Sequence, residues 1–148
     1  MRPRSRGFTL VELLVVLMLM GLIAGMAAFS FGSNMQGAKT RAAVRDLTAA
    51  LRYTRGQAII GHQPQSLEVD VEARTYQAPK RPLIVLPKGL DMKLLTAARE
   101  RTGDTKGLIR FFPDGSSSGG RVTLIRDRHE WRVDIAWLTG EVRMEEGQ

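Results

Sequence analysis

The chain contains no cysteine among its 148 residues and only two histidines, which excludes several kinds of site at the outset. Without thiols, neither a disulfide framework nor a thiolate metal centre can form. His62 and His129 lie far apart and outside any HxH or HExxH pattern, so we expect surface or turn positions for them and no metal site. No pair of carboxylates is spaced for acid–base chemistry, and we expect neither a cofactor nor an enzymatic activity.

Aromatic residues are scarce, at 6% of the chain, and Asp and Glu number 15 against 22 for Lys and Arg. The formal net charge of +7 first suggests an acidic partner such as nucleic acid. Three of the surplus charges, however, are Arg2, Arg4 and Arg6 at the N-terminus, which leaves +4 for the remainder. Residues 39–62 hold five basic side chains against the single acidic Asp46, so the surplus is concentrated in one segment.

What the chain does possess is a long apolar run, residues 8–31, directly after this basic leader. A helix of about 24 residues reaches about 36 Å, enough to cross a hydrocarbon core of about 30 Å. The three leading arginines place the N-terminus in the cytoplasm and the rest of a single-pass chain outside. Glu12 interrupts the run, and because a carboxylate costs about 2.5–3.5 kcal/mol at the centre of a membrane helix, we expect it to have a partner.

Three interpretations of the run compete. A secretory signal peptide would use Gly25-Met26-Ala27 as its cleavage site. A plain transmembrane anchor explains the length of the run but gives no reason for Glu12. The third interpretation rests on a resemblance to a known family.

The string RGFTLVELL, residues 6–14, resembles the class III signal of type IV pilins and type II secretion pseudopilins. The resemblance implies that residues 1–7 are a leader, which a prepilin peptidase removes by cutting between Gly7 and Phe8. The same enzyme then N-methylates Phe8. It also implies that Glu12 neutralises the new α-amine of a neighbouring subunit when apolar helices bundle into a filament, since a buried charge is tolerated when it is paired.

Residues 32–62 are predicted to continue as an amphipathic helix that ends at Gly61. Its apolar positions recur at spacings of three, four and seven residues: Val44, Leu47, Leu51 and Ala58. Four arginines form a stripe beside them on the helical wheel: Arg41, Arg45, Arg52 and Arg55. We interpret the stripe either as a solvated face or as an electrostatic packing face toward anionic headgroups or acidic neighbours.

After Gly61 the helical period gives way to alternation, which predicts a β-rich domain over residues 63–148. Leu67, Val69 and Val71 share one face of a first strand, which turns into a second strand around Tyr76. Prolines punctuate the following connection at Pro79, Pro82 and Pro87.

Further strands are expected at residues 90–94, 108–112, 122–125, 131–137 and 142–144, and a loop at residues 97–107. One buried face is predicted to carry Trp131, Val133, Ile135 and Trp137, with the two tryptophans in the core and not in a base-stacking platform. Two sheets, or one sheet against the long helix, would bury such rows.

This β region carries a second resemblance, in LIRFFPDGSSSGGRVTL at residues 108–124, WRVD at 131–134 and LTG at 138–140. These segments are similar to the soluble domain of minor pseudopilin H and its minor-pilin relatives. The resemblance implies an α+β, pilin-like fold, in which the transmembrane and amphipathic halves of one long helix precede an antiparallel sheet or sandwich that packs on it.

Gly115-Ser116-Ser117-Ser118-Gly119 also satisfies the G-x-S-x-G pattern of a nucleophile elbow. An elbow needs a strand, a sharp turn and a helix, whereas residues 121–125 are predicted to form a strand. We therefore interpret the segment as a flexible hairpin loop and do not assign Ser117 as a nucleophile.

The resemblance implies a low-copy structural subunit near the tip of a periplasmic pseudopilus, anchored in the inner membrane with its C-terminal domain in the periplasm. The implied partners are the prepilin peptidase, minor pseudopilins of the I, J and K types and the major pseudopilin, and the implied role is export of folded proteins. The alternative is a minor pilin that binds DNA for uptake or takes part in pilus assembly. Two basic groups bear on it, Arg99, Arg101 and Lys106 in one loop and Arg121, Arg126 and Arg128 in another, although residues 63–148 net only +1.

Overall fold

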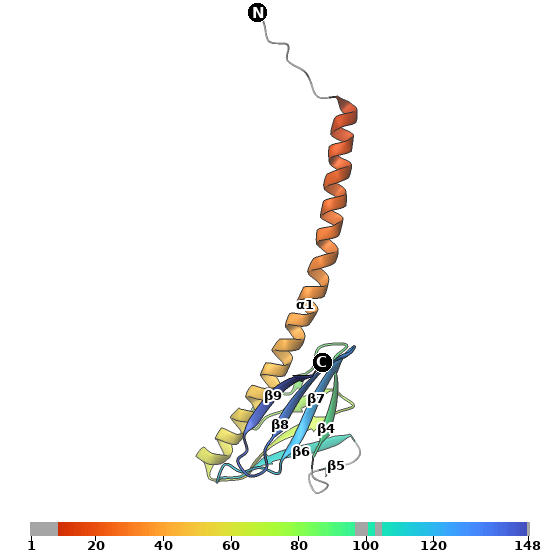
Figure 1. Cartoon of the computed structure of the whole chain (residues 1–148). Helices are drawn as coiled ribbons and strands as arrows, with labels where there is room; N and C mark the ends of the chain where they lie inside the picture. The colour runs from red at the N-terminus through yellow and green to blue at the C-terminus, as the bar shows by residue number, and fades with distance from the viewer. Residues whose placement is uncertain (1–8, 97–100, 103–104, 148) are drawn as a thin grey trace, which may run out of the picture. The chain divides into compact units, whose positions relative to one another are not determined.

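The computed structural model describes residues 9–96, 101–102 and 105–147, without the side chains of residues 26–36 and 101–102. The chain divides into two compact units, Met1–Ala38 and Lys39–Gln148. Helix α1, Leu10–Gly61, begins in the first unit and ends in the second (Figure 1). Each unit is described below by itself.

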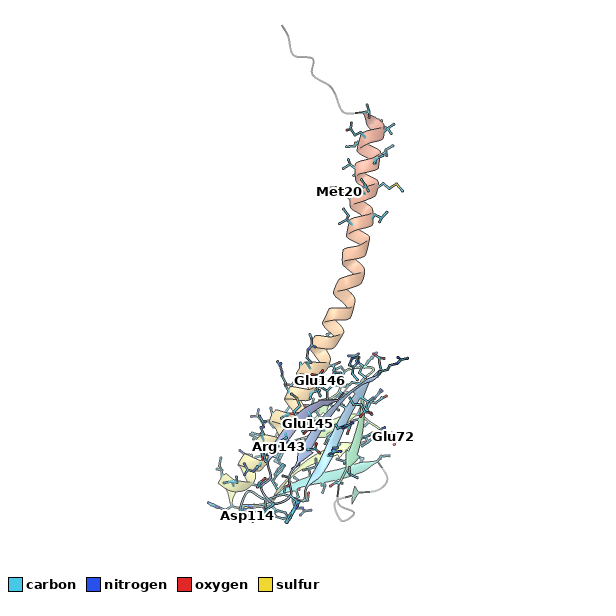
Figure 2. The ribbon with its side chains drawn as sticks, viewed as in Figure 1. Met20, Glu72, Asp114, Arg143, Glu145 and Glu146 are labelled. Atoms are coloured by element: carbon cyan, nitrogen blue, oxygen red, sulfur yellow. The ribbon has the colours of Figure 1, made fainter. Side chains whose placement is uncertain are left out.

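In the first unit the described side chains of α1 are exposed, among them a series of large apolar residues that includes Met20 (Figure 2). Among the residues that the structure describes, no helix has the combined length and apolarity required to cross a membrane. The predicted span of residues 8–31 includes residue 8 and the side chains of residues 26–31, which lie outside the described part.

In the second unit α1 ends at Gly61, where the sequence predicts its end. The left-handed residue that follows is His62, with φ of 50°, and its N–H donates to the carbonyl of Ile59 at 3.4 Å. His62 therefore occupies the position after the helix at which glycine is most common.

Nine described strands form two antiparallel sheets. The first sheet has the order β3 (Ile84–Val85), β2 (Thr75–Gln77), β1 (Gln65–Asp70), β6 (Lys106–Phe111) and β5 (Arg101–Thr102). The second sheet has the order β4 (Asp91–Leu95), β7 (Gly120–Arg126), β8 (His129–Ile135) and β9 (Val142–Gly147), whose strands lie side by side in Figure 1. The predicted α+β class is confirmed.

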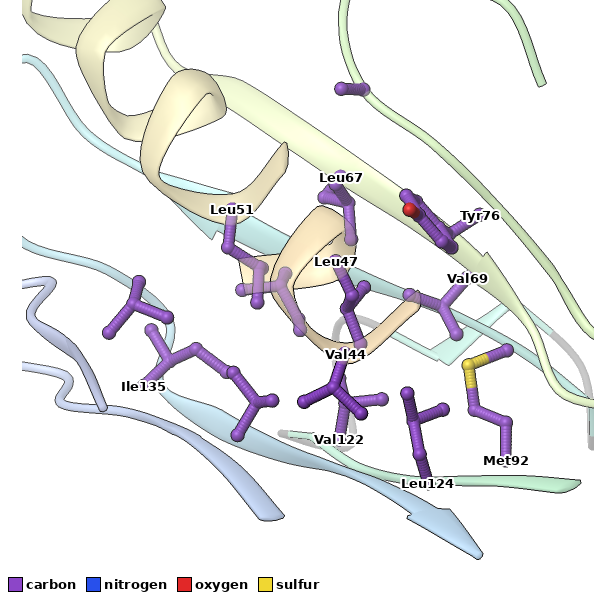
Figure 3. Packing of buried hydrophobic residues seen from close by; sticks show 14 of the residues in the cluster. Val44, Leu47, Leu51, Leu67, Val69, Tyr76, Met92, Val122, Leu124 and Ile135 are labelled. Atoms are coloured by element: carbon purple, nitrogen blue, oxygen red, sulfur yellow. The ribbon is translucent and has the colours of Figure 1, made fainter. Parts of the chain in front are cut away.

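The helix packs against both sheets through the face that the sequence predicts. Val44, Leu47 and Leu51 are at most 1% exposed. In Figure 3 their side chains lie between those of the first sheet, such as Leu67, and those of the second, such as Leu124. A helix alone buries only one stripe, so two sheets on that stripe give the unit one continuous core.

The segment after β2 differs from its prediction. Residues 83–86 were expected to be part of a proline-punctuated connection, whereas Ile84 and Val85 form β3 at the edge of the first sheet. Its partner residues are Tyr76 and Thr75. Within the predicted loop 97–107, the described residues contribute β5 and the start of β6, and residues 97–100 and 103–104 lie outside the described part.

The row of four alternating apolar residues on β8 is also shorter than predicted. Trp131, Val133 and Ile135 are buried, but the side chain of Trp137 is 68% exposed. The strand ends at Ile135, and the chain then turns, with the N–H of Gly140 donating to the carbonyl of Ala136 at 2.8 Å. Placement of Trp137 in the core was therefore wrong, because alternation keeps its meaning only while the strand continues.

Two buried polar atoms, Tyr76 Oη and Trp131 Nε1, lack a hydrogen-bond partner among the described residues. Burial, and secondarily the nearby charge of Asp46, raises the pKa of Tyr76 to about 12. The core thus favours the neutral phenol, although it offers the hydroxyl no acceptor.

We expect Leu47→Ala to lower the free energy of unfolding by about 2–5 kcal/mol, because it leaves a cavity where the helix meets both sheets. Urea unfolding of the full chain in detergent micelles, followed by tryptophan fluorescence, measures the change. The matched control is Arg45→Ala on the exposed face of the same helix, expected to stay within about 0.5 kcal/mol. Equal losses in the two variants would contradict the described core.

Tyr76→Phe tests the buried hydroxyl. At pH 7 we expect it to raise the free energy of unfolding by about 1 kcal/mol, since an unpartnered polar group is removed from the core. Because the pKa of Tyr76 is raised from 10.0 to about 12, the unfolded chain ionises first: this group gives no pH dependence below pH 10 and a loss of stability as the pH rises from 10 toward 12. Urea titrations across that window should show this loss in the unaltered chain and in Tyr53→Phe, but not in Tyr76→Phe.

Candidate functional site

The N-terminal motif is described from Thr9 onward. Thr9 precedes the first helical residue, and its Oγ1 accepts a hydrogen bond from the backbone N–H of Glu12 at 3.3 Å. Thr9-Leu10-Val11-Glu12 fits the T-x-x-E pattern of a capping box, a signal that would have identified Thr9 from the sequence. The Glu12 side chain is exposed in the first turn, where a negative charge also favours the helix dipole.

The cleavage and methylation positions predicted for the same motif, Gly7 and Phe8, lie outside the described residues. The structure therefore adds the helix start and the exposure of Glu12, and leaves the processing of the motif as a prediction.

The predicted arginine stripe divides into two pairs. Arg41 and Arg45 are exposed. Arg52 is also exposed and Arg55 is half-buried, but both donate to main-chain carbonyls of the β region: Arg52 Nη2 donates to the carbonyl of Val142 at 3.2 Å. Helical spacing places all four on one stripe, but only the second pair lies beside strand ends and loops that supply acceptors.

Arg55 joins two loops that are distant in sequence. Its Nε donates to the carbonyl of Gly115 at 3.0 Å, and its Nη2 donates to the carbonyl of Thr139 at 2.9 Å. Gly115 and Gly140 have φ of 86° and 61°, which favour glycine. A Cβ on Gly140 would overlap the Gly115 carbonyl oxygen and approach Arg55 Nε. The close approach of the loops therefore requires glycine there.

Ser117, the central residue of the G-x-S-x-G string, has a structural part in this arrangement. It is buried; its Oγ donates to the carbonyl of Ala136 and accepts from the N–H of Gly119, both at 3.0 Å. Its N–H donates to the carbonyl of Trp137 at 2.8 Å. The serine thus fastens the 112–119 loop to the 136–141 loop, and β7 follows where an elbow would need a helix.

The outer face of the second sheet alternates in charge. Along one row of paired residues, Arg121 lies opposite Asp134, which lies opposite Arg143. Arg121 Nε donates to Asp134 at 2.5 Å, and this hydrogen bond raises the pKa of Arg121. Arg143 in turn pairs with Glu141 at 2.9 Å and lowers the pKa of that carboxyl (Figure 2 labels Arg143 with Glu145 and Glu146). Arg121 with Asp134 and Arg143 with Glu141 thus pair opposite charges along this row.

Of the two basic groups considered for nucleic acid, the second lies within the described residues, and its Arg121 and Arg126 have different partners. Arg121 pairs on the outer face, whereas Arg126 turns to α1, donating to Thr40 Oγ1 at 2.5 Å and to the carbonyl of Lys88 at 2.9 Å. Lys106 pairs with Asp70 at 3.4 Å. Arg99 and the side chain of Arg101 lie outside the described residues.

Neither histidine contributes to a group of ligands. His62 ends the helix, and the His129 ring stacks on Trp131 with centroids 6.1 Å apart. In the part of the chain that the structure describes, no three His, Asp or Glu side chains come together as metal ligands would.

Family models match both parts of the chain. Residues 2–28 match the prokaryotic N-terminal methylation motif, and residues 43–139 match the type II transport protein GspH. The second match begins on the packing face of α1, runs through strands β1 to β8, and ends at residue 139, before Gly140 and β9.

Similar proteins agree with these matches. The type II secretion system protein H of Xanthomonas campestris pv. campestris is 38% identical over 142 residues, which cover 96% of this chain and 84% of that protein. Two structures of the minor pseudopilin EpsH of Vibrio cholerae share the fold: at 14% and 16% identity they have TM-scores of 0.56 and 0.57, covering 72% and 74% of this chain and 95% and 96% of theirs. This chain belongs to the GspH family of type II transport proteins.

Proposed function

We propose that this chain is a minor pseudopilin, a structural subunit without catalytic activity of its own, at or near the tip of the periplasmic pseudopilus that helps export folded proteins across the outer membrane. The observation that carries the proposal is the presence, in one chain, of the methylation motif at residues 2–28 and the GspH region at residues 43–139. The α1-on-two-sheets fold is consistent with it.

In this proposal residues 1–7 are removed by a prepilin peptidase, Phe8 is N-methylated, and residues 8–31 anchor the chain in the inner membrane before entering the filament. The β-rich domain faces the periplasm. Glu12 neutralises the α-amine of a neighbouring subunit. Its exposure in the first turn supports this role, because the carboxylate is accessible to a second helix.

The arginine stripe contributes to assembly through its outward pair. Arg41 and Arg45 are exposed on α1, and carboxylates of the major pseudopilin or of the I-, J- and K-type subunits are suitable partners for them. Arg52 and Arg55 act within the chain, by holding the strand ends and loops beside the helix.

Glu12→Gln tests the pairing with the amine. The variant keeps the size of the side chain but removes its charge, and an unpaired buried amine costs about 3–5 kcal/mol. We expect cleavage after Gly7 and methylation of Phe8 to proceed, while recovery of the chain in sheared filaments falls by more than about tenfold. Intact mass and N-terminal sequencing of membrane-extracted protein measure the processing, and immunoblots measure the recovery.

The matched control is Glu72→Gln, an exposed carboxylate in the turn between β1 and β2 (Figure 2), which should leave both readouts unchanged. A mature N-terminus at Ala28 would refute the processing and favour a secretory signal peptide. Normal filament recovery of Glu12→Gln would refute the role of the carboxylate.

Reversal of the outward pair, Arg41→Glu with Arg45→Glu, should lower cross-linking to neighbouring subunits several-fold and leave the free energy of unfolding within about 0.5 kcal/mol.

Arg55→Lys should instead lower the free energy of unfolding by about 1–3 kcal/mol and leave cross-linking unchanged, because a lysine cannot span two carbonyls. Urea unfolding and cross-linking of the full chain separate the two effects. Destabilisation by the outward pair would contradict the division of the stripe.

A further inference from the structure

We propose that the free edge of β3, at residues 83–85, is a docking site for an extended acidic segment of another subunit of the same filament, which adds to the first sheet as a strand. The inference rests on the proposed function only in taking the partner to be a filament subunit. The site itself lies within the second unit and follows from main-chain direction, a neighbouring groove and charge.

The main chain of Val85 faces away from the sheet. The N–H of Leu86 donates to the carbonyl of Arg74 at 2.9 Å, which makes these two residues a hydrogen-bonded pair. Ile84, two residues before Leu86, lies opposite Tyr76 on β2. Since hydrogen-bonded pairs alternate in an antiparallel ladder, Val85 directs its N–H and C=O outward. No other strand of the described chain pairs with β3 on that side, so these groups are accessible to a strand from another chain.

The edge also exposes apolar side chains on both faces. Leu83 and Val85 are 56% and 66% exposed, and Ile84 projects on the opposite face. On the Ile84 side a groove of about 300 Å³ lies between α1 and β3. Besides Ile84, it is lined by the small and apolar residues Ala49, Ala50, Tyr53, Ala78 and Pro82 and by two charged residues, Asp46 and Arg81. Alternate side chains of an added strand would therefore reach the groove on one face and Val85 on the other.

Charge defines the chemistry of the partner. Residues 77–90 contain Lys80, Arg81 and Lys88 and no acidic residue, so positive charge flanks the apolar edge at both ends. Asp46 of α1 lines the same groove as Arg81, which leaves the basic side chains in excess. Arg81 is fixed over the ring of Tyr53, with its guanidinium carbon 4.6 Å from the ring centroid. Carboxylates at the two ends of an apolar segment complement this arrangement.

A second copy of this chain is a poorer partner than another subunit. Its candidate acidic strand is β9, with Glu145 and Glu146. Glu145, however, already lies opposite Arg132 across the β8–β9 pair, and Arg143 precedes it on the same strand. The acidic charge of β9 is thus partly offset within the chain.

The test uses the full chain in cells that produce the complete secretion system. A photo-reactive benzophenone amino acid replaces Leu83, or Arg132 on the outer face of β8 as the matched control, and adducts are mapped by mass spectrometry. We expect a strong adduct at position 83 with an acidic, alternating segment of another filament subunit, and little at position 132.

Two substitutions then probe the interaction in the Leu83 cross-linking background. Val85→Pro removes the outward N–H, whereas Val85→Thr keeps it at nearly the same size, so only the former should lower the adduct yield, by at least about fivefold. Lys80→Glu with Lys88→Glu should lower it similarly, and reversal of the acidic residues in the mapped segment should restore it. Thermal unfolding of each full chain in detergent verifies that it remains folded.

Several outcomes would overturn the proposal: an adduct with a second copy of this chain, with lipid or with a helical surface, or equal sensitivity to Val85→Pro and Val85→Thr. Failure here is distinguishable from failure of the proposed function. Methylated Phe8 and normal filament recovery without an adduct at position 83 would refute only the β3 site.

Discussion

Burial of one face of α1 between two sheets is the constraint on which the second unit depends. Val44, Leu47 and Leu51 are almost completely buried, and neither sheet has another described helix to cover its inner face. This burial fixes the rotation of the helix about its axis. The rotation then decides which side chains remain outside, and therefore what the helix can offer to a partner.

The arginine stripe shows what helical periodicity can and cannot determine. Spacing along the chain places Arg41 and Arg55 on the same side of α1, as the sequence predicts. It does not determine what lies alongside each turn, and Arg55 meets carbonyls 60 and 84 residues away in sequence. Contacts at such separations depend on how the sheets fold back, so one stripe serves two purposes that its pattern could not distinguish.

Local signals account for most of the fold, and their failures have physical causes. The apolar helix face, the inward row of β1 and that of β8 as far as Ile135 follow their predicted periods. The prediction that Trp137 is buried was wrong because β8 ends two residues earlier, at Ile135. Gly140, which is left-handed in the structure, was the sequence signal for the turn that follows. β3 was missed because its prolines indicated a connection, and prolines are also compatible with a short edge strand. The cap at Thr9 was readable from T-x-x-E.

The surface charges of the two sheets are balanced to different degrees, and this difference favours binding of a charged partner at β3. On the outer face of the second sheet, Arg121 and Asp134 compensate one another, so the face attracts neither sign strongly. Around β3, residues 77–90 hold three basic side chains and no acidic one, and Asp46 of α1 lines the groove beside them. Positive charge that is paired on the outer face of one sheet therefore remains in excess at the edge of the other.

An exposed apolar edge strand normally promotes aggregation, and the prolines beside β3 explain how the chain tolerates one. Pro82 and Pro87 confine the extended stretch to four residues, and only Val85 within the strand presents its main chain outward. So short an edge cannot hold a strand of arbitrary sequence by main-chain hydrogen bonds alone, since each contributes only about 0.5–1.5 kcal/mol. Specific binding must then depend on side chains that fit the groove beside Tyr53 and on carboxylates that meet Lys80 and Lys88. The shortness of the β3 edge thus both prevents unspecific strand pairing and makes binding at this edge selective.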